Sequence, residues 1–188
     1  MKKIIILLLI LTFAVSLAQT GDYKSSAAHT HVLFKAKHLG VAYTFGRFNE
    51  HEGNLYYDTM DPTDSQIEFN ILTESVDTNN KKRDDHLRSP DFFDAANFPA
   101  ISFKSTSIEK TDTENHYTVI GKLNLHGVTK EIRIPVEFTG SGKTPQGQDV
   151  IGFYTEFTID RSDYGMSNLL GATGGGELLI IFSFEGTK

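Results

Sequence analysis

The sequence has 188 residues and a net charge of −6, and a charge of this sign does not attract nucleic acid through the overall field of the protein. It contains no cysteine, which excludes disulfides, cysteine nucleophiles and a lipoprotein anchor. A chain of this length fits one domain whose core can be stable without disulfides.

The first residues have the three parts of a secretory signal peptide. Lys2 and Lys3 form a basic start, an apolar run follows over residues 4–15, and Ser16 and Ala18 are small residues before a cleavage site. We expect a signal peptide at residues 1–18, a mature domain at residues 19–188 and a periplasmic or secreted location. The alternative is an uncleaved membrane anchor, but the apolar run is shorter than the roughly 20 residues that span a bilayer.

Alternation of apolar and polar residues dominates the chain from residue 30 to its end. A period of two places one set of side chains on one face of a sheet, so the pattern predicts about eight strands and no ordinary amphipathic helix. The predicted strands are residues 32–37, 48–57 (a weaker run), 66–71, 101–105, 117–125, 132–138, 151–159 and 178–184.

Turn residues separate the strands. His126-Gly127 predicts a tight hairpin, and residues 144–147, with Pro145 and Gly147, predict a type I turn. The alternation stops between residues 73 and 99. There Ser89, followed by Pro90, has the pattern of a helix N-cap, so we expect one or two short helices packed across one opening of the fold.

Strands with one apolar face need either closure into a barrel or a partner sheet. We predict an all-β fold, an eight-stranded antiparallel barrel with one or two short helices in a connection, and keep a two-sheet sandwich as the alternative. Residues at mid-strand and in phase are expected to form the wall of an interior cavity, although in a ligand-free barrel they would fill it. They are Val32, Phe34, Phe69, Ile71, Phe103, Leu123, Ile134, Phe157, Ile159 and Phe182.

The sequence gives weaker evidence for metal binding or catalysis. On a strand, His29 and His31 would point the same way, which is a geometry that metal sites use, but a third ligand would have to come from elsewhere in the fold. The paired carboxylates, such as Asp160 and Asp163, favour capping and surface ion pairs over catalysis. No Gly-x-Ser-x-Gly motif occurs.

The sequence resembles the YceI-like polyisoprenoid-binding proteins from about residue 29 to residue 184. The most specific block lies between residues 78 and 103, and further blocks agree along the chain. The matching motifs are Arg83-Asp84, His86-Leu87, Asp91-Phe92-Phe93-Asp94, Phe98-Pro99, Ile101-Ser102-Phe103, His38-Leu39-Gly40, His126-Gly127-Val128-Thr129-Lys130 and Arg161-Ser162-Asp163-Tyr164-Gly165-Met166.

The resemblance implies a lipocalin-like barrel that carries an isoprenoid lipid, either a polyprenyl phosphate or an isoprenoid quinone, without cofactor or catalytic activity. It implies no nucleic-acid partner and leaves transient membrane contact and a homodimer as options. Arg161 is a candidate contact for the lipid head group because guanidinium matches phosphate geometry, and an ion pair with a neighbouring aspartate is the alternative. Arg83 and His86 are weaker candidates. The alternative function is a metal-binding protein or metal-dependent enzyme built on His29 and His31.

Export is directly testable. Protein secreted by an expressing bacterium should begin at Gln19, because Ala18 completes the cleavage signal. N-terminal sequencing or intact mass measures this end, with a cyclised Gln19 as the expected modification. A mature protein that still begins at Met1 would contradict export by cleavage.

Overall fold

The computed structural model describes residues 19–173 and 175–188, so the predicted signal peptide at residues 1–18 lies outside the described residues. Eleven strand segments form a single antiparallel sheet. They are β1 (Gly21–Ser25), β2 (His31–His38), β3 (Ala42–Phe48), β4 (His51–Tyr57), β5 (Gln66–Leu72), β6 (Val76–Asp77), β7 (Ala100–Lys110), β8 (His116–Leu125), β9 (Val128–Lys143), β10 (Asp149–Asp160) and β11 (Glu177–Thr187).

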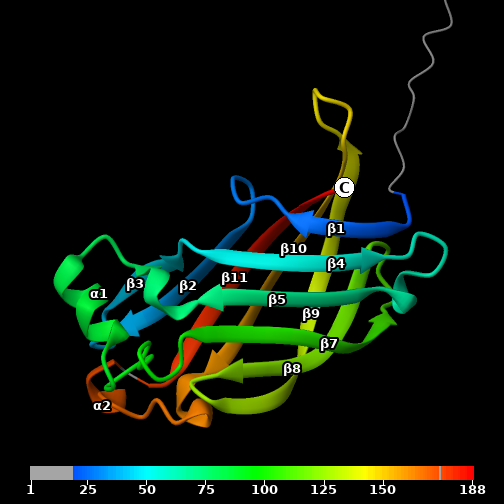
Figure 1. The fold of residues 1–188 in the computed structure, drawn as a ribbon. Coiled ribbons are helices and arrows are strands. Elements are labelled where there is room, and N and C mark those ends of the chain that lie inside the picture. The colour runs from blue at the N-terminus through cyan, green and yellow to red at the C-terminus, as the bar shows by residue number, and fades with distance from the viewer. Residues whose placement is uncertain (1–18, 174) are drawn as a thin grey trace, which may run out of the picture.

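The eleven segments form the eight strands of a closed barrel (Figure 1). Three of the eight strands are interrupted. The first consists of β1 and β2, which both pair with β11. The second consists of β4, which pairs with β1, and β3, which pairs with β2. The third consists of β5, which pairs with β4, and β6, which pairs with β3. Pairing of β1 with β11 closes the sheet. The predicted antiparallel barrel is therefore confirmed, and the sandwich alternative is wrong.

The strand breaks correct one sequence prediction. Residues 48–57 do not form one strand, because Phe48 ends β3, two residues intervene, and β4 begins at His51. Strand β1 and most of β3 carry no clear alternation. These two strands were not predicted from the sequence, and the structure defines them by their pairing with neighbouring strands.

The tight hairpin predicted between β8 and β9 is present. His126 has φ 51° and Gly127 has φ 75°, as the mirror-image turns of two-residue hairpins require. Between β9 and β10, the amide of Gly147 donates to the carbonyl of Thr144 at 2.8 Å, which closes the predicted turn.

The connection between β5 and β7 contains one α-helix, α1 (Lys81–Arg88), together with the short segment β6 and the 3-10 turn η2 (Thr73–Ser75). Ser89 was predicted to start a helix, and this is wrong: it ends α1, which begins at the N-cap Asn80. The physical reason is Pro90, which forces the preceding residue out of the helical region. Ser89 accordingly has extended dihedrals, with φ −70° and ψ 168°.

A buried hydrogen-bond network holds this connection together. The carboxylate of Asp84, which is 7% exposed, accepts from the amide of Thr78 at 2.8 Å and from its hydroxyl at 2.5 Å. Arg83 donates to the hydroxyl and carbonyl oxygens of Thr78, and Arg88 donates to the carbonyl of Val76 at 2.8 Å. The network stabilises the connection at one end of the barrel.

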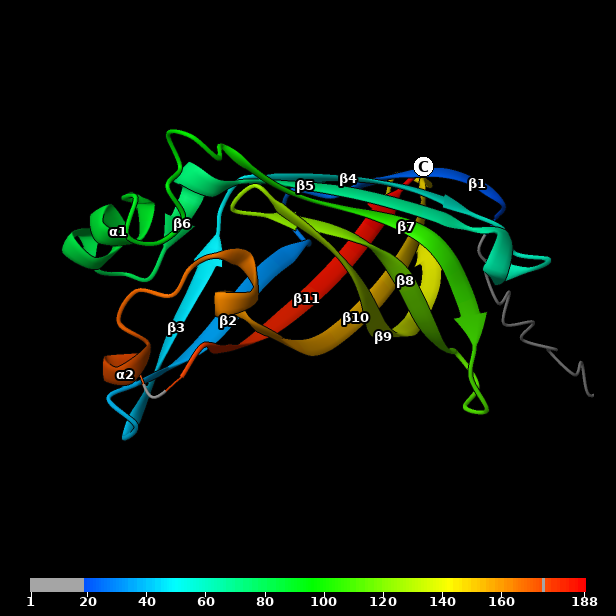
Figure 2. The same cartoon turned by 90° about the horizontal axis from the view of Figure 1, so that it is seen from below.

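Helix α1 shares this end with a second short helix, α2 (Leu170–Thr173), in the connection between β10 and β11 (Figure 2). That connection begins with the 3-10 turn η3 (Arg161–Tyr164). Among the described residues, no helix combines the length and apolarity that a membrane span requires.

Replacing Asp84 tests the hydrogen-bond network. Asp84→Ala leaves the buried amide of Thr78 without its partner and should lower the free energy of unfolding by about 1–3 kcal/mol. Urea denaturation followed by circular dichroism measures the change. The matched control is Asp85→Ala, an exposed neighbour in surface ion pairs with Lys81 and Arg88, which should stay close to the wild type. Equal losses in both variants would contradict the assigned role of the network.

Candidate functional site

The barrel encloses an apolar cavity. Its empty volume is about 1190 Å³, which includes the space at its opening to solvent. All ten residues that the alternation assigned to a cavity wall lie on it: Val32, Phe34, Phe69, Ile71, Phe103, Leu123, Ile134, Phe157, Ile159 and Phe182. The structure therefore places these residues together around one space, and their contact with a ligand stays a prediction.

The cavity wall offers almost no polar group to a ligand. Its lining contains no Asp, Glu, His, Lys or Arg, and the polar side chains on it are Tyr154 and Thr155. The hydroxyl of Thr155 donates to the carbonyl oxygen of Pro135, and that of Tyr154 donates to the carboxylate of Glu156. Both hydroxyls thus already have partners. The interior suits a hydrocarbon chain.

Three inward-facing glycines explain why so many phenylalanines leave room inside the barrel. A Cβ at each glycine would come closer than 3.0 Å to a phenylalanine ring of a neighbouring strand. Each ring therefore occupies the space that a side chain would take at that position, against the wall of the barrel. The pairs are Phe34 on Gly46, Phe69 on Gly53, and Phe103 on Gly121.

Sequence analysis missed several wall residues. Phe93 comes from the connection between α1 and β7, where no period of two exists, and its ring lies 5.5 Å from that of Phe48 in an edge-to-face contact. Most others share the phase of the predicted set and could have been found by extending it along each strand, whereas Leu55 lies on β4, from which no wall residue was predicted. These other wall residues are Leu55, Ile67, Ile101, Val119, Leu125, Ile132, Val136, Phe153, Leu178, Ile180 and Phe184.

A smaller hollow continues from the cavity between β4, β8 and the 3-10 turn η1 (Pro62–Asp64). Five residues line both spaces: Leu55, Ile67, Val119, Val136 and Phe153. The residues that the smaller hollow adds include Tyr57 and Tyr117. Burial raises the pKa of Tyr57 to about 12, so its hydroxyl stays protonated at neutral pH. This end of the interior is therefore neutral as well.

Arg161 lies outside the cavity lining and is 5% exposed. Its guanidinium donates to the carbonyls of Met166 at 2.5 Å and Asn168 at 2.6 Å, and it lies over the ring of Phe92. Burial lowers the pKa of Arg161. The group holds the connection between β10 and β11, and contact with a lipid head group stays a prediction.

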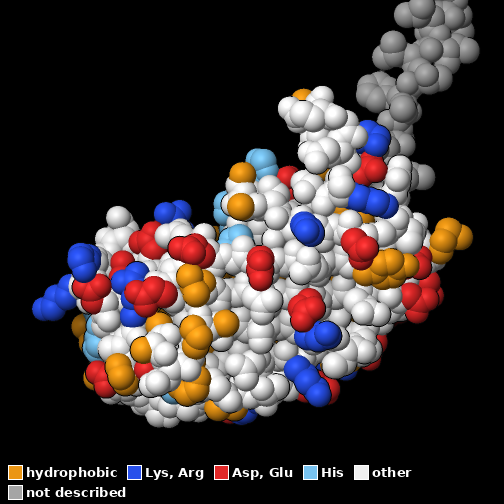
Figure 3. All heavy atoms as spheres, in the orientation of Figure 1, with side chains coloured by type: hydrophobic (Ala, Val, Ile, Leu, Met, Phe, Trp, Pro, Cys, Tyr) orange, Lys and Arg blue, Asp and Glu red, His pale blue; other side chains and the backbone are white. Residues whose placement is uncertain are grey.

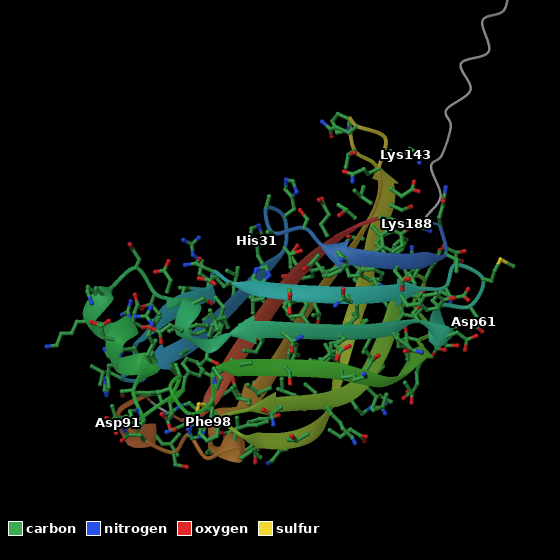
Figure 4. All side chains as sticks on the ribbon, viewed as in Figure 1. His31, Asp61, Asp91, Phe98, Lys143 and Lys188 are labelled. Carbon is green, nitrogen blue, oxygen red and sulfur yellow. The ribbon has the colours of Figure 1, made fainter. Side chains whose placement is uncertain are left out.

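The other two head-group candidates also have structural partners. Arg83 bonds Thr78 within the connection, while the ring of His86 lies 3.2 Å from the carboxylate of Asp91. Asp91 and Phe98 lie at the helical end of the barrel, whereas His31 lies on the wall away from them (Figure 4). The head-group candidates therefore all belong to the two connections at the helical end, whereas His31 does not.

The proposed histidine pair does not share a strand, and that prediction is wrong. His29 lies in the turn before β2, where its Nδ1 is 2.9 Å from a carboxylate oxygen of Glu185, and His31 is the first residue of β2. Within residues 19–173 and 175–188, no group of three or more His, Cys, Asp or Glu side chains is arranged to hold a metal ion.

Known proteins resemble the chain over nearly its whole length. The model of the YceI-like domain matches residues 23–185. A UPF0312 protein of Yersinia pestis is 36% identical over 180 residues, which cover 95% of this chain and 92% of that protein.

Two solved structures share the fold. BcnA of Burkholderia cenocepacia is 22% identical with a TM-score of 0.76, covering 86% of this chain and 98% of its own. A polyisoprenoid-binding domain from Saccharophagus degradans is 14% identical with a TM-score of 0.66, covering 90% and 99%. At these identities, the two structures show that the barrel fold is shared.

The pairing of rings with glycines can be tested by adding one methyl group. Gly53→Ala should force the ring of Phe69 out of its place and into the cavity, which lowers the free energy of unfolding by about 1–3 kcal/mol and reduces cavity volume. Urea unfolding measures stability. The affinity for a fluorescent fatty acid should fall if the displaced ring takes up space in the cavity.

Gly142→Ala on β9 is the matched control, because a Cβ there would meet only Val150, at 3.7 Å. If both variants bind the fatty acid like the wild type and unfold at the same urea concentration, the position of the Phe69 ring does not depend on Gly53.

Proposed function

This chain belongs to the YceI-like domain family, and we propose that it binds a long isoprenoid lipid, a polyprenyl phosphate or an isoprenoid quinone, inside its barrel. The observation that carries the proposal is the closed barrel with an apolar cavity whose wall has no Asp, Glu, His, Lys or Arg side chain. The polyisoprenoid-binding domain with the same fold supports the choice of lipid.

The energetics favour a carrier. Burial of each CH₂ group away from water is worth about 0.8 kcal/mol, so a tail of several isoprene units enters the cavity strongly from water. In a membrane the tail is already buried, and the net gain on transfer is small. The protein can therefore exchange its lipid with membranes, and the small number of polar contacts keeps that exchange reversible.

Binding without catalysis agrees with the position of the ionisable residues. Asp84 and the head-group candidate Arg161 are buried in hydrogen-bond networks of the two connections and do not line the cavity. We propose that the protein is not an enzyme. The signal-like residues 1–18 support a carrier that works in the periplasm or outside the cell.

A single cavity-blocking substitution tests the proposal. Val32 lies on the cavity wall and is 5% exposed, so Val32→Phe places a ring into the open space. Protein purified from a membrane-containing host should carry an isoprenoid by native mass spectrometry. Val32→Phe should lose it while its melting temperature stays nearly unchanged, since an empty cavity accepts the ring.

The control is Val150→Phe, because Val150 is half-buried on β10 but does not line the cavity. This variant should keep its lipid. Wild-type protein without lipid, even after incubation with polyprenyl phosphate and with an isoprenoid quinone, would reject the carrier function. A stability loss of about 1–3 kcal/mol in Val32→Phe would indicate a filled core instead of a cavity.

A further inference from the structure

Exposed apolar side chains gather on the hairpin formed by β2 and β3. We define the hairpin patch as Leu33, Leu39, Val41, Tyr43 and Phe45. Val41 is 85% exposed, Phe45 63%, Leu39 61% and Tyr43 57%. Single exposed apolar residues are ordinary, but a contiguous group on one hairpin marks an interaction surface.

The register of the hairpin interleaves this patch with lysines. On the outer face, Lys35 pairs with Phe45, and Lys37 pairs with Tyr43. The Nζ atom of Lys35 lies 4.8 Å from the ring centre of Tyr43. Among the described residues, neither lysine forms an ion pair, and residues 33–45 include no acidic residue. The hairpin is therefore locally basic and apolar within a protein of net negative charge.

The position of the hairpin leaves most of this surface exposed. Its turn projects past the barrel wall next to α2 (Figure 2). One edge of β3 pairs with β2, and on the other edge β6 pairs with Arg47 and Phe48 alone. Within the described part of the chain, this second edge is therefore unpaired from Ala42 to Gly46. Hydrophobic side chains also gather below α1 at this helical end of the barrel (Figure 3).

The geometry points to an anionic lipid surface as the partner of the hairpin patch. Aromatic rings and apolar residues at a convex turn suit the membrane interface, where lysine stems lie along apolar surface and their ammonium groups reach the phosphates. A second copy of the chain fits less well. A symmetric interface would bring the lysines of one patch against those of the other without a carboxylate between them.

The patch lies on the outside of one cavity wall. Strand β2 carries Val32 and Phe34 on its inner face, and Leu33, between them, belongs to the hairpin patch on the outer face. Docking would thus hold the barrel against the bilayer and shorten the path of a lipid tail between cavity and membrane. This exchange role rests on the proposed function, whereas the docking itself does not.

Vesicle binding tests the docking. Because all strands of the described residues lie between Gly21 and Thr187, residues 19–188 serve as the protein, which keeps the apolar residues 4–15 from binding vesicles themselves. Co-sedimentation compares vesicles of phosphatidylethanolamine with 30% phosphatidylglycerol, as a chosen composition of roughly bacterial charge, against pure phosphatidylcholine. The wild type should bind the anionic vesicles, and added salt should weaken that binding.

The double variant Val41→Ser, Phe45→Ser should reduce binding at least ten-fold. The matched control is Met60→Ser, Tyr56→Ser, which removes two exposed apolar side chains away from the hairpin and should bind like the wild type. Lys35→Gln with Lys37→Gln should remove the preference for anionic vesicles. Circular dichroism should show the same folded state in every variant.

Wild-type protein that binds neither vesicle, or hairpin and control variants that bind equally, would overturn the proposal. Self-association that is lost in the hairpin variant, without vesicle binding, would overturn it in favour of a second copy. Native mass spectrometry of the same samples separates this result from the proposed function. A protein that docks but carries no isoprenoid rejects only the carrier, and one that carries lipid without docking rejects only the surface.

Discussion

Packing of phenylalanine rings onto inward-facing glycines is the constraint on which the interior of this barrel depends. A barrel of eight strands has just enough room for its own side chains or for one small ligand. With the rings of Phe34, Phe69 and Phe103 seated where a Cβ would otherwise lie, the aromatic area covers the wall and the centre stays open. Dispersion contacts between ring and backbone replace the contacts that a filled core would supply.

An open apolar centre decides how the protein can recognise a ligand. Without Asp, Glu, His, Lys or Arg on the wall, selection rests on the length and shape of a hydrocarbon chain. Affinity from water is then large, while transfer from a membrane is nearly neutral. Such a protein needs a way to reach the membrane, and the exposed hairpin of β2 and β3 lies at the end of the barrel that carries both helices.

The buried polar residues of the two connections serve the architecture. Asp84 and Arg161 each form hydrogen bonds with backbone groups of a long connection. These backbone groups need side-chain partners because a connection, unlike a strand, has no neighbouring strand to pair with. A buried charge with several hydrogen bonds to one loop determines the shape of that loop. The helical end of the barrel thus keeps a defined form next to a cavity that has none of these polar contacts.

Local sequence determined most of the strands and which of their side chains share a face, although β1 and most of β3 were not among them. This is why all ten residues chosen by phase lie on the cavity wall, and why the turn at His126-Gly127 is where the pattern predicts it. A period of two does not specify which strands become neighbours. Closure of the sheet, the split of residues 48–57 into two segments and the place of Phe93 therefore depended on tertiary structure. The same holds for the glycines, since an absent side chain has a role only once a ring from another strand lies over it.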